Sequence, residues 1–216
     1  MVDSGNGLVG NGEADFDLCF VRPTYTTRTK KITDRSMIGD ESQQKLESLI
    51  NRSFMERGMK LLPEYFSLPL WESFQYLLIV EDLLNERDAG ILLAFKPEDF
   101  IIYDKIAVPP EYRRRHIMPQ LIRTARAHDM RAYGHIEAAL KTSDKTAHEK
   151  YRRTSDFSTL VPKAEAHPHY WVHIFSSKSR NYTTDQKIRR IADYLATMPS
   201  SFASVENLQP QHLLRG

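Results

Sequence analysis

The 216-residue sequence has little cysteine, no long apolar run and almost no net charge. Cys19 is the only cysteine, so no disulfide can form within the chain, which is typical of a reducing compartment. The strand-like residues around Cys19 favour a buried apolar role for it over a nucleophilic one. No apolar run approaches the roughly 18 residues that a membrane span needs. These absences exclude a disulfide scaffold and an integral membrane protein.

The first 15 residues have neither the basic start nor the apolar core of a signal peptide. We therefore expect a cytoplasmic protein without a membrane partner, in which residues 1–15 are a disordered lead-in. The net charge of +2 shows that the chain is no polycation. The charge is uneven, however, because six arginines stand against a single acid, Asp129, between Arg113 and Arg131.

Apolar residues make up 41% of the chain and charged residues 27%, as in ordinary globular proteins, and the length suits one domain. We predict a single domain over residues 16–198 and a loosely ordered tail over 199–216. In its first part, residues 16–21 suggest a strand, and a polar stretch follows over 22–35. Apolar spacings of three and four predict a helix that begins near Asp40 or Ser42 and ends at Gly58. Pro63 and Pro69 restrict the next segment to short helical turns.

From residue 74 onward, short apolar runs alternate with helical patterns. The predicted elements are a hairpin over 76–80 and 91–95, a strand over 100–108, a helix over 117–131, a strand over 135–140, a helix over 144–154, a strand over 170–175 and a helix after Thr183 or Thr184. Antiparallel strands thus precede a strand–helix–strand crossover. This order predicts a mixed α/β (α+β) fold, in which a mainly antiparallel sheet is flanked by helices and an extra C-terminal helix follows.

The clearest functional signal is the basic turn that joins the strand over 100–108 to the next helix. Three arginines, Arg113, Arg114 and Arg115, crowd the start of that helix. A helix N-terminus presents unpaired N–H groups to anions, and guanidinium groups add charge-assisted hydrogen bonds to phosphate oxygens. On spacing alone, phosphate binding competes with a solvated basic turn that contacts a nucleic acid or an acidic partner.

Residues 104–117, Asp-Lys-Ile-Ala-Val-Pro-Pro-Glu-Tyr-Arg-Arg-Arg-His-Ile, resemble the cofactor segment of the GNAT superfamily of acyl-CoA-dependent N-acyltransferases. In that family a strand ending in Val leads to an Arg/Gln-x-x-Gly-x-Gly/Ala loop, whose amides hold the CoA pyrophosphate. The resemblance implies the GNAT fold, acetyl-CoA or another acyl-CoA as co-substrate, no metal, and a small-molecule amine as acceptor. The cofactor contacts that it implies are Ala107, Val108, Arg113, Arg114, Arg115, His116, Ile117 and Met118.

Asp104-Lys105, together with Tyr-Arg-Arg-Thr-Ser-Asp over 151–156, is similar to the acetyltransferase domain of N-acetylglutamate synthases. This narrower resemblance implies arginine biosynthesis, with direct transfer of acetyl, or of succinyl, to the α-amine of an acidic amino acid such as glutamate. It makes Tyr151 the acid that protonates the leaving thiolate, and a backbone N–H near Ala107 or Val108 the donor to the carbonyl oxygen. Lys105 and Lys141 would bind the acceptor's carboxylate. The structural alternatives are a tyrosine packed against the sheet and two solvated lysines.

His116 and Met118 occupy the places where the family has glycines, which allow close approach of the backbone to the pyrophosphate. The main alternative is therefore a catalytically degenerate GNAT-fold binding or regulatory module. Nucleic-acid binding by the arginines between 113 and 131 is a second alternative, but no aromatic residues interleave with them. A homodimer, reached by the N-terminal stretch, also stays open.

Three histidines, His167, His169 and His173, are separated by even numbers of residues, so an extended chain would place them on one side. A fully extended segment separates the outer two by about 20 Å, which is too far for one metal ion. We expect them to line a cleft or to cover the rim of a strand, and one of them is a candidate base for the proton of the amine.

Overall fold

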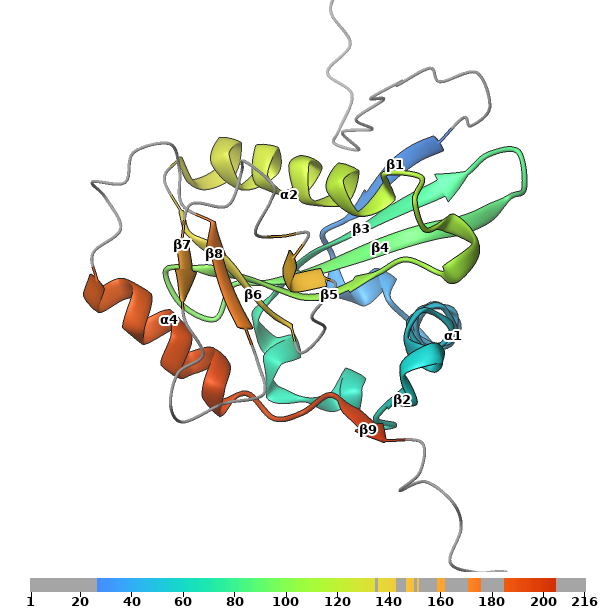
Figure 1. Ribbon diagram of the computed structural model, residues 1–216. Coiled ribbons are helices and arrows are strands. Elements are labelled where there is room, and N and C mark those ends of the chain that lie inside the picture. Colours follow the sequence, from blue (N-terminus) through green and yellow to red (C-terminus); the bar gives the residue numbers. More distant parts are fainter. Residues whose placement is uncertain are drawn as a thin grey trace, which may run out of the picture.

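The computed structural model describes residues 27–134, 136–142, 147–149, 151, 159–161, 171–175 and 185–204 (Figure 1). Helix α2 (Ile117–Tyr133) covers one face of a central sheet, and helices α1 (Asp40–Phe54) and α4 (Asp185–Thr197) cover the other. A buried apolar cluster lies beneath each helix. This arrangement confirms the predicted α/β fold of a sheet flanked by helices. Of the helices that these ranges contain, none combines the length and apolarity that a bilayer span requires.

The central sheet has seven strands in the order β1-β3-β4-β5-β6-β8-β7. Their bounds are β1 (Thr27–Ile32), β3 (Phe74–Asp82), β4 (Arg87–Phe95), β5 (Ile101–Ala107), β6 (Ala138–Thr142), β7 (Thr159–Val161) and β8 (Trp171–Phe175). Only β5 and β6 pair in parallel. The sheet is therefore mainly antiparallel, as predicted. Strands β1 and β7 were not predicted, and β1 lies inside the supposed polar stretch over 22–35. The predicted strand over 16–21 lies outside the described residues.

Helix α1 follows the predicted pattern, since Leu46, Leu49 and Ile50 are buried against the sheet. Its N-cap is Gly39, so Asp40 is the first helical residue and adds an acid to the first turn. After a short 3₁₀ turn, η2 (Met55–Arg57), the chain reverses at Gly58, whose φ of +62° is left-handed. Glycine takes this conformation without steric cost, which confirms it as the stop. Two further 3₁₀ turns, η3 (Tyr65–Ser67) and η4 (Pro69–Ser73), occupy the proline-broken segment.

Residues 199–204 belong to the folded structure, which corrects the prediction of a loosely ordered tail from residue 199 onward. They contain β9 (Phe202–Ser204), which pairs antiparallel with β2 (Met59–Leu61) to form a second, two-stranded sheet. The N–H of Leu62 also donates to the carbonyl of Ser201, at 3.0 Å. Backbone pairing with a distant strand, rather than any local pattern, orders this segment. The remaining tail, residues 205–216, lies outside the described residues.

Strands β5 and β6 pair only through Ile101 and Ile102, which lie opposite Ala138 and Ala139. Beyond these positions β5 continues to Ala107 beside β4, while β6 continues to Thr142 beside β8. The two strands therefore separate along the second half of their length, and the sheet opens between them (Figure 1). This separation places backbone and side chains of both strands around one open space.

A β-bulge interrupts the pairing of β5 with β4. Leu93 lies opposite Lys105 and Ala94 opposite Tyr103, so Asp104 is the extra residue on β5. A bulge re-aims the side chains beside it. As a result Asp104 and Lys105, neighbours in sequence, both contact Tyr65 on the side of the sheet away from α2. Tyr103 belongs to the cluster beneath α2 instead.

Candidate functional site

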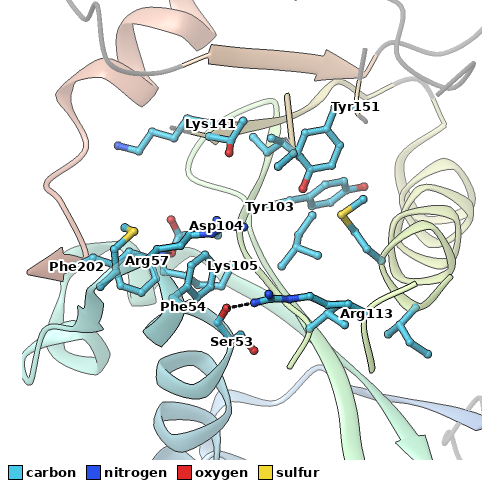
Figure 2. A pocket seen from close by; sticks show the side chains of 18 of the residues that line it. Ser53, Phe54, Arg57, Tyr103, Asp104, Lys105, Arg113, Lys141, Tyr151 and Phe202 are labelled. Atoms are coloured by element: carbon cyan, nitrogen blue, oxygen red, sulfur yellow. Dashed lines mark hydrogen bonds and ion pairs between the residues drawn. The ribbon is translucent and has the colours of Figure 1, made fainter. Parts of the chain in front are cut away.

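A cavity of about 750 Å³ lies where β5 and β6 separate (Figure 2). Its walls come from the ends of α1 and β2, from β5 and β6, from the N-terminus of α2, and from the segment that leads into β9. Nine of the eleven site residues expected from the sequence line it, namely Lys105, Val108, Arg113, Arg114, His116, Ile117, Met118, Lys141 and Tyr151. Ala107 and Arg115 are not among the lining residues. Positions spread over 47 residues of sequence are thus brought together by the fold.

Asp104 and Lys105 form a buried ion pair in the wall of the cavity, with 2.5 Å between Lys105 Nζ and Asp104 Oδ2. The hydroxyl of Tyr65 donates to the same carboxylate oxygen at 2.8 Å. The ammonium of Lys105 also lies 4.9 Å from the ring centre of Tyr65 and 5.1 Å from that of Phe202. Burial lowers the pKa of Lys105, and the attraction of Asp104 opposes that shift. A lysine predicted to be a substrate ligand thus sits between two aromatic rings and a carboxylate.

Lys141 lines the opposite side of the cavity on β6. Its ammonium donates to the carbonyl oxygens of Leu195 and Met198, at 3.1 and 3.2 Å. These carbonyls lie at the C-terminal end of α4, where a cation is favoured by the helix dipole. Burial lowers the pKa of Lys141. The side chain therefore links β6 to α4, while the attraction of Asp104 opposes the lowering of its pKa.

The turn that precedes α2 contains two left-handed residues, neither of which is glycine. His116 is the N-cap of α2 with a φ of +61°, and Arg114 has a φ of +65°. Residues other than glycine pay a steric cost in this left-handed region. Met118 lies in the first turn of α2 and is not left-handed. Of the two supposed glycine positions, only His116 thus demands an unusual backbone.

The three arginines of the turn have different surroundings. Arg113 donates to the carbonyl of Ser53 at 2.9 Å and pairs with Glu56, which ties the turn to α1 and η2 (Figure 2). The guanidinium of Arg115 lies 5.1 Å from the ring centre of Tyr112. Arg114, the left-handed residue, lines the cavity. Arg114 is therefore the strongest candidate among them for an anionic ligand.

The start of α2 meets the sheet at Gly90 on β4. A β-carbon at Gly90 would lie 2.7 Å from Ile117 Cγ2, 3.2 Å from the carbonyl oxygen of Ala107 and 3.3 Å from Val108 Cγ2. Only a residue without a side chain leaves room for this contact. Gly90 thus lets the N-terminus of α2 approach the end of β5, where the cavity begins.

Tyr151 is buried and lines the cavity close to Tyr103 in Figure 2. Its ring centre lies 5.1 Å from that of His173 on β8, and His173 Nε2 is 3.3 Å from His148 Nδ1. The ring of His148 in turn stacks on Trp171. Burial, followed by the nearby His148, lowers the pKa of His173 to about 4. His173 therefore stays neutral at physiological pH, while His167 and His169 lie outside the described residues.

A buried carboxylate supports the wall of the cavity from beneath α2. Asp129 accepts hydrogen bonds from the hydroxyls of Tyr76 and Tyr103, at 2.8 and 2.5 Å. Arg126 lies 3.9 Å from the same carboxylate. Burial raises the pKa of Asp129, against the two tyrosine hydrogen bonds and Arg126. This network fixes Tyr103 in the cavity wall.

Several lining residues were missed by sequence reasoning, namely Ser53, Phe54, Arg57, Met59, Tyr103, Ser200, Ser201 and Phe202. Most come from α1, η2, β2 and β9, elements that no motif connects to the basic turn. Asp104 was noted only as part of the Asp-Lys pair. Within the part of the chain that the structure describes, no group of three or more His, Cys, Asp or Glu residues is placed to hold a metal ion.

No protein-family model matches the sequence, and no curated protein is similar to it. Solved structures share its fold. An acyl-CoA N-acyltransferase from Pseudomonas aeruginosa aligns with a TM-score of 0.55 and 13% identity, over 69% of this chain and 99% of the other. A GNAT-family acetyltransferase from Staphylococcus aureus Mu50 aligns at 0.51 and 12%, over 68% and 98%. The PaiA N-acetyltransferase from Thermoplasma acidophilum, in complex with coenzyme A, aligns at 0.50 and 11%, over 70% and 99%. The chain thus has the GNAT fold.

Proposed function

We propose that this chain transfers an acyl group from an acyl-CoA to an amine. The observation that carries the proposal is the cavity between the separated strands β5 and β6, with the N-terminus of α2 at its rim. The structural neighbours with this fold are acyl-CoA N-acyltransferases, and one of them is in complex with coenzyme A. A cavity of about 750 Å³ has the size of a small-molecule site.

The turn before α2 suits the pyrophosphate of the co-substrate. The first N–H groups of a helix have no partner inside it, and the positive end of the dipole favours an anion there. Arg114 adds a guanidinium at the same rim, and the left-handed backbone at His116 maintains the turn without glycine. We assign pyrophosphate binding to residues 114–118 and regard Arg113 as the residue that holds the turn to α1.

In the proposed reaction the amine attacks the thioester carbonyl directly. The backbone N–H of Val108, at the cavity end of β5, is our candidate donor to the carbonyl oxygen. Tyr151 is our candidate acid for the leaving thiolate, because its side chain lines the cavity between β6 and α2. Buried Ala107 supports this segment from the α1 side of the sheet.

The acceptor that we propose is an acidic amino acid such as glutamate, as in an N-acetylglutamate synthase. Arg57, Lys105 and Lys141 line the cavity, and among the described lining residues Asp104 is the single acid. This excess of cations favours an acceptor with more carboxylates than amines. The same charges would accept a succinyl group in place of acetyl.

Calorimetric titration with acetyl-CoA and succinyl-CoA tests the co-substrate site. Replacing Arg114 with alanine should weaken binding about tenfold or more, because it removes a charge-assisted hydrogen bond. Arg123→Ala is the matched control, since it removes one exposed arginine from the outer face of α2. Equal affinities in both variants would contradict the site. Acetylation of glutamate, followed by release of free CoA, then tests the reaction.

The degenerate binding module stays the second candidate, because non-glycine residues take the left-handed positions and Met118 lines the cavity. Micromolar binding of acetyl-CoA without product from any amine would favour it. Absence of binding to either thioester would contradict the transferase and would also favour the binding module, with a pyrophosphate loop closed by His116 and Met118.

A further inference from the structure

Asp104 lies between two cavities. Besides the main cavity it lines a second one of about 200 Å³, which is bounded by η3, η4 and the end of α4. The bulge in β5 puts it there, since Asp104 is the residue without a partner on β4. Bulges are frequent beside active sites, where they re-aim a side chain. Only 5% of the Asp104 side chain is exposed. Burying a carboxylate costs free energy unless polar or charged groups contact it.

The two oxygens of this carboxylate are used differently. Lys105 and Tyr65 both donate to Oδ2, at 2.5 and 2.8 Å. Among the described residues, no hydrogen bond reaches Oδ1. Oδ1 is also not one of the fully buried side-chain atoms that lack a partner, so it keeps some accessible surface. A carboxylate has room for about four hydrogen bonds, so Oδ1 keeps free capacity in a residue that lines both cavities.

We propose that Asp104 Oδ1 receives the amine of the acceptor and takes up its proton. This inference rests on the proposed function, and it names the base that the reaction needs. Lys105 contacts only Oδ2, at 2.5 Å, and so leaves Oδ1 open to a second cation. An amino acid acceptor then meets a carboxylate for its ammonium and cations for its own carboxylates, within one cavity.

The proton balance follows from this placement. The acceptor's ammonium gives one proton to Oδ1, and its nitrogen lone pair then forms the bond to the thioester carbonyl carbon. The C–S bond breaks with its electron pair on sulfur, which takes a proton from Tyr151. The nitrogen's second proton restores Tyr151 as the amide forms. One proton is left on Asp104 and passes to solvent.

The neighbouring titratable groups are less suited to this role. Lys105 and Tyr65 already donate to Oδ2. Lys141, on β6, donates to carbonyls at the end of α4, and Tyr194, on α4, lines only the second cavity. The hydroxyl of Tyr103 donates to Asp129. His173 lies behind Tyr151 and is not a lining residue.

Asp104→Asn is the test, with acetyl-CoA and glutamate as substrates. The amide keeps the shape of the side chain but cannot take the proton, so kcat/KM for glutamate should fall about 100-fold near neutral pH. Only the neutral amine would then react, so the variant's rate should rise about tenfold per pH unit up to the amine's own pKa. Wild type should reach its plateau at lower pH. The affinity for acetyl-CoA should change less than about twofold, because its proposed pyrophosphate site lies in the turn after β5 and not at Asp104.

Tyr65→Phe is the matched control, because it removes a hydrogen bond from Oδ2 of the same carboxylate. We expect its kcat/KM to stay within about threefold of wild type, with an unchanged pH profile. An equal loss in Tyr65→Phe would show that the network around Oδ2 matters rather than Oδ1. An Asp104→Asn variant with wild-type rate and pH profile would also overturn the inference.

The single variant leaves Lys105 without its counter-ion, which can prevent folding. The double variant Asp104→Asn, Lys105→Met removes both buried charges and should fold, bind acetyl-CoA and show the same alkaline rise. A flat pH profile in this variant would overturn the inference even if the single variant is insoluble. If wild-type protein transfers acetyl to no amine, the proposed function itself fails, which is a different outcome from an active Asp104→Asn.

Discussion

Replacing Gly90 with alanine should disturb the proposed co-substrate site from the sheet side. The added carbon would lie 2.7 Å from Ile117 Cγ2 and 3.2 Å from the carbonyl oxygen of Ala107, so one neighbour has to move. The backbone of β5 is held by its pairing with β4, whereas Ile117 begins α2. We therefore expect the N-terminus of α2 to shift outward, away from the position that its anion site requires.

The magnitude follows from two opposing effects. Overpacking of this kind typically costs about 1–3 kcal/mol, and loss of glycine's freedom in the unfolded chain returns about 0.4–1 kcal/mol. A net loss of about 1–2 kcal/mol corresponds to a fall in Tm of about 2–8 °C for a domain of this size. Because the strain is concentrated at Ile117, the affinity for acetyl-CoA should fall as well. If about 1.4 kcal/mol of the strain energy is lost from the binding free energy, the affinity falls about tenfold.

Differential scanning calorimetry and titration with acetyl-CoA measure the two effects of Gly90→Ala. Gly39→Ala is the matched control, because a β-carbon at Gly39 meets nothing within 4 Å and its φ is −72°. In this control alanine is a poorer N-cap for α1, which destabilises the protein, but it also lowers the entropy of the unfolded chain, which stabilises it. The two effects are similar in size, so we expect little net change. If Gly90→Ala matched Gly39→Ala in both Tm and affinity, the contact between α2 and the sheet would not position the site.

Two further predictions concern the turn and the histidine pair. His116→Gly should leave stability unchanged or raise it by about 0.5 kcal/mol, since it relieves a left-handed residue, whereas Met118→Gly should lower it by about 1 kcal/mol in a helical turn. Urea unfolding compares the two, and equal losses would refute the difference. The pKa of His173 is lowered to about 4, so the unfolded chain binds more protons between pH 6.5 and 4, and stability should fall as pH falls through that window. His173→Gln should lose this part of the acid sensitivity in urea midpoints measured at pH 7 and pH 5, and an unchanged difference would contradict the assignment.

Local sequence signals were sufficient for the elements whose periodicity is regular. The apolar spacing in α1, the hairpin of β3 and β4, and the strand that leads through β5 into α2 all lie where the pattern indicated. Gly58 ends its segment for a reason that is itself local, namely its left-handed φ. The basic turn was also recognised from sequence, because arginines before a helix form a pattern that needs no distant partner.

The remaining features depend on contacts between distant segments. Strand β9 is ordered by pairing with β2, and β1 by pairing with β3, although neither has a strong strand pattern of its own. The roles of Arg113 and Lys141 likewise depend on the carbonyls of Ser53, Leu195 and Met198, which no local pattern could reveal. These contacts of Arg113 and Lys141 are visible only in the folded chain, and their predicted ligand roles stay predictions.

The sequence by itself determined that a strand, a basic turn and a helix follow one another, because each is specified by neighbouring residues. Only the tertiary structure decided which side chains face the cavity. The bulge that turns Asp104 and Lys105 to the same side arises from register against β4, and the opening between β5 and β6 arises from the different partners of the two strands. Such register is a property of paired strands, so the buried carboxylate in the cavity wall became visible only in the folded chain.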